Sequence, residues 1–554
     1  MLARGGKMEA GAALVGALID AGVDTAFTVP GESFLAVLEA LRKNRNRVRL
    51  VSVRQEGGGT LAANAYGAIR GVPAAVFVSR GPGATNASIG LHTAYQDSVP
   101  LVLFMGQVRS HMKGREAFQE IDPHSAFASM AKAVLEPKDA GEMARMARMA
   151  VEISVSGRPG PVVVVMPRDF GEMEVDAPVE QGAFQRAEVS ANAAALEGLA
   201  AALNAAERPL ILAGELARAP VAREALRGFV EALGAPLLCG YRCQDVLDNL
   251  HPGYAGHLEI NPVAYQNTLV DEADLICVVG SRLDGITSRE EGLIAAGRDW
   301  AHIHPDQAVL ARFAAPRQVL GDIGPSLETL TSALAAPSSD RSAWRDAAHE
   351  TFMAFSKAGS YPAHGAVDPS VVAAEAREML PDNAIVVTDA GSSARWVHRF
   401  FHYREAQTQG GTACGAMGAG VPGAIGAMLA TNDGRPVVAF AGDGSFLMSG
   451  QELSTAARER LPIKVVVCDN NVHGSILKGQ LDKYGDEHAF GTVMDSPDFA
   501  KLAESYGAAA WTVKTTAEWR PAFTAALAHD GPALIHLHMD ARDIAPYGGE
   551  KDAV

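Results

Sequence analysis

The chain has 554 residues, 48% of them hydrophobic, and a formal net charge of −16 at pH 7. This length corresponds to about three domains of roughly 150 residues, and the apolar content is enough for large cores. The acidic balance excludes nucleic acid as an expected partner, because phosphate binding needs a basic surface. The five cysteines are scattered without metal-ligand spacing, which favours a reducing, cytoplasmic environment.

The N-terminus superficially resembles a secretion signal, because Arg4 and Lys7 precede an apolar stretch over residues 10–19. We predict a helix of the fold there instead, since the apolar residues share one helical face and aspartates follow at once. Residues 27–30 then start the first strand. Residues 1–7 are expected to precede the fold, which begins at Met8.

A single carboxylate stands at the end of the next predicted strand, residues 48–53. Glu56 follows it, and three glycines lead into a predicted helix from Thr60 to Arg70. Ligands of parallel α/β sheets bind at this end of the strands, and glycines allow close approach of a cofactor or subunit. One glutamate before glycines is usually an ordinary loop residue, so a catalytic role needs support from elsewhere in the chain.

A glycine-rich segment follows the predicted strand at residues 74–78. It spans residues 79–86, reads SRGPGATN, and is predicted to be a loop. By itself it fits any turn between a strand and a helix. Further along, residues 117–120 contain Phe118 and Gln119, which are candidate pocket residues. Packing in the core is the alternative interpretation of Phe118.

Composition divides the chain into three predicted domains, residues 8–175, 190–336 and 369–545. Polar linkers are expected at residues 174–190 and 336–368. In the middle domain, predicted strands at residues 209–213, 235–239, 274–279 and 301–303 alternate with alanine-rich helices. This alternation is typical of a parallel sheet covered on both sides. The predicted fold class is therefore α/β, with three doubly wound parallel-sheet domains.

Residues 410–432 contain no charged residue. A membrane-spanning helix needs about 20 strongly apolar residues, whereas this segment consists mainly of glycine, alanine and threonine. We therefore expect no membrane span. The segment, which includes Gly415 and Met417, is better interpreted as backbone packed closely around a ligand.

Polar residues follow both strands of a predicted βαβ unit in the third domain. Gly442-Asp443-Gly444 follows the strand at residues 436–441, and Asp469-Asn470-Asn471 follows the strand at residues 463–468. Parallel strands bring these ends together, and Asp443 and Asn470 offer the oxygen ligands that Mg²⁺ prefers. A single helix is predicted from Ser445 to Leu461, and its first N–H groups would face an anion. The sequence therefore predicts a site for Mg²⁺ and a diphosphate.

Together these segments resemble the motifs of the thiamin diphosphate (ThDP)-dependent superfamily, in the branch of acetolactate (acetohydroxyacid) synthases and 2-oxoacid decarboxylases. The resemblance covers nearly the whole chain and implies pyrimidine-binding, middle Rossmann-like and diphosphate-binding domains. It implies that Glu56 activates the cofactor and that Phe118 and Gln119 lie near the reacting carbon. The implied Mg²⁺ ligands are Asp443, Asn470 and the carbonyl of Val472. The implied cofactor-binding residues are Gly31, Gly415, Met417, Gly442, Gly444, Ser445, Asn470 and Gly474.

The resemblance also implies an assembly. Glu56 and Asp443 lie in different predicted domains but serve one cofactor, and in this family they meet across a subunit interface. We therefore expect a homodimer or a dimer of dimers. Some members bind FAD in the middle domain and others bind nothing there, and no glycine fingerprint decides between these alternatives here.

Two departures from the synthases concern the acceptor substrate. Ile286 stands where the family motif G-x-R-F-D-D-R ends in the arginine associated with the acceptor's carboxylate, and about Gly479 stands where synthases carry a tryptophan. A hydrophobic residue cannot replace a bidentate carboxylate partner. We therefore predict a carboligase that decarboxylates a 2-oxoacid, or cleaves a related C–C bond, and uses an unusual acceptor.

Three alternatives remain. A simple 2-oxoacid decarboxylase is one, although the adjacent histidine pair of such decarboxylases is absent. A 2-hydroxyacyl lyase is another. A non-catalytic ThDP-binding protein is disfavoured because Glu56 is retained.

Overall fold

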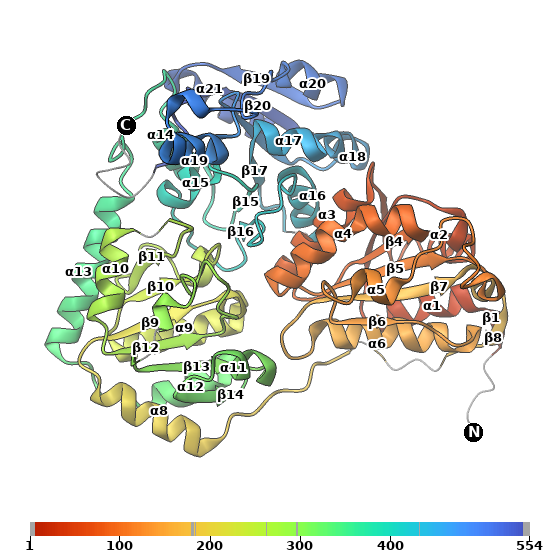
Figure 1. Ribbon diagram of the computed structural model, residues 1–554, viewed down its shortest axis with the longest axis horizontal. Helices are drawn as coiled ribbons and strands as arrows, with labels where there is room; N and C mark the ends of the chain where they lie inside the picture. The colour runs from red at the N-terminus through yellow and green to blue at the C-terminus, as the bar shows by residue number, and fades with distance from the viewer. Residues whose placement is uncertain are drawn as a thin grey trace.

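The computed structural model describes residues 6–178, 182, 184–261, 263–294, 297–431 and 433–546. Most of the segment 1–7 and part of the predicted linker at 174–190 lie outside these residues. The chain forms three domains, each built on a six-stranded parallel sheet with helices on both faces (Figure 1). The predicted fold class is confirmed.

The N-terminal domain carries the sheet β3-β2-β4-β5-β7-β6. Its strands are β2 (Thr25–Thr28), β3 (Arg49–Ser52), β4 (Ala75–Ser79), β5 (Leu101–Gln107), β6 (Ala133–Leu135) and β7 (Pro161–Pro167). Its helices are α1 (Ala10–Asp20), α2 (Leu35–Lys43), α3 (Glu56–Arg70), α4 (Arg80–Asp97), α5 (Pro123–Phe127), α6 (Met143–Val155) and α7 (Arg168–Gly171). A separate antiparallel pair joins β1 (Lys7–Glu9) to β8 (Glu174–Asp176).

The glycine-rich segment 79–86 is not a loop, because α4 already begins at Arg80. Pro82 is tolerated in the first turn of a helix, where its missing N–H has no partner to lose. Gly81 packs against the backbone of Gln119, whose carbonyl accepts a hydrogen bond of 2.9 Å from the Gly81 N–H. The prediction of a loop was therefore wrong.

The middle domain carries the sheet β11-β10-β9-β12-β13-β14. Its strands are β9 (Pro209–Ala213), β10 (Leu237–Cys239), β11 (Tyr254–His257), β12 (Leu275–Val279), β13 (Trp300–His304) and β14 (Arg317–Leu320). Its helices are α8 (Ala193–Ala205), α9 (Pro220–Leu233), α10 (Ala264–Glu272), α11 (Gln307–Phe313), α12 (Ile323–Ala333) and α13 (Ser339–Phe355). Helix α13 occupies the predicted linker at 336–368 and packs on β11, where the rings of Phe352 and Tyr254 lie 5.0 Å apart.

The C-terminal domain carries the sheet β16-β15-β17-β18-β20-β19. Its strands are β15 (Ile385–Thr388), β16 (Gln409–Gly410), β17 (Val437–Gly442), β18 (Lys464–Asp469), β19 (Ala509–Val513) and β20 (Ala533–His538). Its helices are α14 (Pro369–Met379), α15 (Ala394–Phe400), α16 (Gly420–Ala430), α17 (Asp443–Ser449), α18 (Leu453–Glu459), α19 (Gly474–Tyr484), α20 (Phe499–Ser505) and α21 (Thr516–Ala528).

The single helix predicted from Ser445 to Leu461 is broken into α17 and α18. A short 3-10 turn, Gly450–Glu452, separates them. The Glu452 carboxylate accepts hydrogen bonds from the backbone N–H groups of Arg54 and Gln55, at 2.9 and 3.0 Å. The break therefore places Glu452 against the N-terminal domain, a long-range contact that helical spacing cannot show.

Helix α16 packs on α3, and one hydrophobic core runs through both domains. Gly426 of α16 lies so close that a Cβ there would overlap the carbonyl oxygen of Ala62. Among the described helices, none is both long enough and apolar enough to cross a membrane.

We expect Gly426→Ala to lower the free energy of unfolding by about 1–3 kcal/mol, the usual cost of overpacking. Gly228→Ala in α9 is the matched control, because a Cβ there meets no atom within 4 Å. It should be neutral or stabilising by up to about 1 kcal/mol. Urea unfolding followed by circular dichroism measures both. Equal shifts in the two variants would contradict the close packing of α16 on α3.

Candidate active site

A pocket of about 280 Å³ lies at the carboxyl ends of β15 and β17. The chain passes from β15 to the edge strand β16 and returns on the other side of β15 to form β17, so strand order reverses between these two strands. Such reversal points are where open α/β sheets bind ligands. The predicted residues that line the pocket are Gly415, Met417, Gly442, Asp443, Gly444, Ser445, Asn470, Val472 and Gly474.

Asp443 is the first residue of α17, and its side chain is buried. Its two carboxylate oxygens accept hydrogen bonds from the backbone N–H groups of Gly444 and Asn471, at 2.7 and 2.8 Å. Burial raises the pKa of Asp443 to about 6, and the nearby Asp469 carboxylate adds to this shift. A cation at this position would relieve the cost of the buried negative charge.

Asp469, the residue before Asn470, has its own partner in this chain. His536 Nε2 donates a hydrogen bond of 2.8 Å to Asp469 Oδ2. Burial alone would raise the pKa of Asp469, but hydrogen bonds, first that from His536, hold it below its usual value. The neighbouring Asn470 lines the pocket. Asp469 is thus held by His536, and Asn470 remains the ligand candidate.

Glycines allow the segments that line the pocket to pack closely against one another. A Cβ at Gly444 would lie 2.9 Å from the His473 ring, and one at Gly474 would lie 2.9 Å from Ser392 Oγ. The side chains of Asp443 and Asn470 offer oxygen ligands, and glycines and backbone N–H groups lie beside them. Together these groups fit a Mg²⁺-bound diphosphate.

Asp389 was missed by the sequence analysis. It follows β15 and is buried, and its carboxylate accepts hydrogen bonds of 2.7–3.2 Å from the N–H groups of Gly418, Ala419 and Gly420. It thereby fixes the backbone after Gly415 and Met417. Its position after a strand, like those of Glu56 and Asp443, was the available signal. Tyr241, Ile260 and Arg395 also line the pocket without having been predicted.

The N-terminal candidates do not line this pocket. Glu56 starts α3, and its carboxylate accepts a hydrogen bond of 2.9 Å from Asn86 Nδ2. At Gly31 a Cβ would overlap the Ser79 side chain. Gln119 adopts a left-handed backbone with φ of 66°. Phe118 is 76% exposed, so its alternative interpretation as a core residue was wrong.

A larger cavity of about 630 Å³ lies where the strands of the middle domain end, beside residues of the N-terminal domain. This volume lies in the range of cofactor sites, about 300–1,000 Å³. Among the described lining residues Arg186 is the one arginine or lysine, and it forms an ion pair of 2.7 Å with Asp322. The space suits a nucleotide but the charges do not favour a diphosphate, so FAD stays a prediction.

Three family matches cover the three domains. Residues 8–126 match the thiamine pyrophosphate enzyme, N-terminal TPP binding domain, residues 196–330 match its central domain, and residues 389–537 match its C-terminal TPP binding domain. Thiamine pyrophosphate is another name for ThDP.

Curated relatives match over almost the whole chain. The acetolactate synthase large subunit of Parasynechococcus marenigrum (strain WH8102) is 33% identical, over 95% of this chain and 87% of the relative. The isozyme 2 large subunit of Escherichia coli (strain K12) is 30% identical, over 95% of each chain. The chloroplastic acetolactate synthase 1 of Nicotiana tabacum is 30% identical, over 98% of this chain and 84% of the relative. The chain therefore belongs to the ThDP-dependent enzyme superfamily, in its acetolactate synthase-like branch.

Proposed function

We propose that this enzyme requires Mg²⁺, decarboxylates a 2-oxoacid and joins the remaining fragment to a carbonyl acceptor. The observation that carries this proposal is the pocket that brings Asp443, Asn470 and the glycine segments together at one sheet edge. ThDP, when bound, supplies an electron sink for breaking and forming C–C bonds next to a carbonyl. All five cysteines are free, which supports a cytoplasmic location.

Different residues of the chain would bind the metal ion, bind the cofactor and activate it. Asp443, Asn470 and the Val472 carbonyl would hold Mg²⁺, and the glycines at 442, 444 and 474 would admit the diphosphate. Gly415 and Met417 form the wall that would hold the rest of the cofactor. Glu56 would hold and move the proton that activates it.

We infer that two copies of the chain form each site. Glu56 is not among the residues that line the pocket holding Asp443, so a second copy must supply the carboxylate if both serve one cofactor. Four large apolar side chains are exposed in the single chain. Phe118 belongs to the N-terminal domain, and Ile476, Phe490 and Val493 belong to the C-terminal domain. Burying them against a partner would be favourable. A homodimer or a dimer of dimers meets this requirement.

A substrate panel tests the reaction. Purified enzyme with Mg²⁺ and ThDP is given 2-oxoacids and 2-hydroxyacyl compounds, with and without aldehyde acceptors, while CO₂ and C–C products are measured. Acceptor-dependent products support the carboligase. CO₂ with an aldehyde alone would indicate a simple decarboxylase, cleavage of the 2-hydroxyacyl compound would indicate a lyase, and no turnover would indicate a ThDP-binding protein without activity.

Ile286 predicts weak formation of acetolactate from pyruvate. It lies half-buried in the loop after β12, where its N–H donates to Asp284 Oδ1 at 3.0 Å. We expect Ile286→Arg to raise acetolactate formation by about 10- to 100-fold, because a charged hydrogen bond is worth roughly 1.5–3 kcal/mol. Leu250→Arg, at an exposed position, should have no effect. Ordinary synthase activity in the unmodified protein would show that Ile286 does not limit acceptor use.

A further inference from the structure

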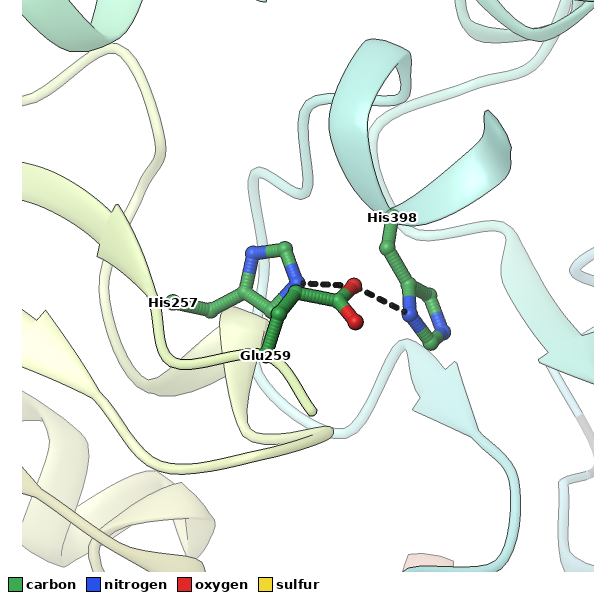
Figure 2. Close-up of side chains that lie close together, drawn as sticks. All are labelled: His257, Glu259 and His398. Carbon is green, nitrogen blue, oxygen red and sulfur yellow. Dashed lines mark hydrogen bonds and ion pairs between the residues drawn. The ribbon is translucent and has the colours of Figure 1, made fainter. Parts of the chain in front are cut away.

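Two histidines and a glutamate meet where the middle and C-terminal domains touch (Figure 2). His257 ends β11, Glu259 follows two residues later, and His398 lies on α15. Glu259 Oε1 lies 2.8 Å from His257 Nε2 and 3.2 Å from His398 Nδ1. Their side chains are 7%, 13% and 0% exposed in the order His257, Glu259 and His398. The cluster is therefore interior, at the contact of two domains.

We propose that His257, Glu259 and His398 bind a transition-metal ion of the zinc type, at a site distinct from the Mg²⁺ site. Imidazole nitrogens and a carboxylate oxygen are ordinary zinc ligands, and three of them leave one coordination position open. A cavity of about 30 Å³ borders all three side chains. This volume is large enough for a water molecule, which can complete the coordination.

The surroundings of His398 allow a tautomer in which Nδ1 is free to bind a cation. His398 Nε2 lies 3.0 Å from Thr388 Oγ1, and that hydroxyl lies 3.5 Å from the Gly410 carbonyl oxygen. If Nε2–H donates to the hydroxyl and the hydroxyl donates to the carbonyl, the lone pair of Nδ1 faces Glu259. A lone pair opposite a carboxylate oxygen repels it unless a cation lies between them. Metal-bound histidines commonly have such a partner on their other nitrogen.

Arg395 orients the Glu259 carboxylate through the oxygen atom that does not contact the histidines. Arg395 Nε lies 3.6 Å from Glu259 Oε2, and Oε1 is left to face the two rings. Arg395 also lines the cofactor pocket. Its positive charge opposes a second cation, so the affinity should be lower than at a site without an arginine. A metal ion here would tie the two domains together beside the cofactor pocket.

Metal content tests the proposal. The protein is freed of metal with a chelator, saturated with Mg²⁺ and ThDP, given Zn²⁺, and passed through gel filtration before elemental analysis. We expect about one zinc ion per chain. His257→Gln and His398→Gln should each lose it.

Two control variants locate the ion. His538→Gln alters the other described cluster, formed with Asp469 and His536 next to Asn470. His251→Gln alters a histidine that lies only 3.4 Å from a single carboxylate, Glu231. Both controls should retain zinc. Loss of zinc in His538→Gln together with its retention in His257→Gln would overturn the proposal.

A new absorption band in a cysteine variant distinguishes a true metal site from misfolding of the glutamine variants. The protein is loaded with Co²⁺, and His257→Cys should add a thiolate-to-cobalt absorption band that the unmodified protein lacks. If the unmodified protein binds no zinc in the presence of Mg²⁺, or if His257→Cys leaves the cobalt spectrum unchanged, the three residues form only a hydrogen-bonded contact between domains.

Discussion

Replacing Glu56 by glutamine should lower turnover by at least about 100-fold while changing ThDP affinity much less. Glutamine keeps the size of the side chain and can still pair with Asn86, whose Nδ2 donates to Glu56 at 2.9 Å. It cannot take up or release a proton, however, so the activation that we assign to the carboxylate is lost. Steady-state kinetics and ThDP titration by calorimetry separate the two effects.

Glu172→Gln provides the control, because Glu172 is exposed in the same domain. Its turnover should match the unmodified enzyme. Near-normal turnover in Glu56→Gln would remove this residue from the proposed role, and equal losses of turnover and ThDP affinity would assign it to binding alone.

Mixing two inactive variants tests the shared site. Co-expression of Glu56→Gln with Asp443→Ala chains should give about half heterodimers, each with one intact site, and so about a quarter of normal activity. If Glu56 and Asp443 served a site within one chain, every site would carry a substitution and no activity would return. The measurement needs only two affinity tags and a turnover assay.

Several central strands could be predicted because parallel strands buried on both faces are continuous apolar runs. Ala75–Ser79 and Val437–Gly442 are of this kind. The edge strands β11 and β14 lack such runs, since β11 contains Gly256 and β14 begins with the polar residues Arg317 and Gln318, and both were missed. Local propensity does not identify strands whose pairing partner supplies most of the stabilisation.

The site was predictable where its residues are close in sequence to a strand end. Gly442-Asp443-Gly444 and Asn470 meet this condition, and the structure places them in one pocket. Asp389 also follows a strand but was missed, because its role depends on N–H groups near Gly420, some thirty residues later. The group of His257, Glu259 and His398 forms only when two domains pack, so nothing in the local sequence indicates it.

Asp443→Ala should abolish activity and weaken ThDP binding at a fixed Mg²⁺ concentration by more than about 100-fold, beyond the usual effect of altering groups around a metal ligand. The buried carboxylate is the one charged ligand proposed for the ion, and alanine supplies no oxygen. EDTA followed by gel filtration should remove both Mg²⁺ and ThDP from the unmodified enzyme, and added Mg²⁺ should restore activity. Asp443→Ala should not recover.

The pH dependence gives an independent check on the same carboxylate. Burial raises the pKa of Asp443 to about 6, so the side chain takes up a proton as the pH falls through that value. Since Mg²⁺ binds the ionised form, its affinity should be about half-maximal near pH 6, approach its full value about one pH unit higher and decline as the pH falls below 6. Asp433→Ala, at a carboxylate paired with Arg435 on the surface, should leave this profile unchanged. Wild-type ThDP affinity in Asp443→Ala would mean that Mg²⁺ is not held by Asp443, because alanine offers no oxygen ligand.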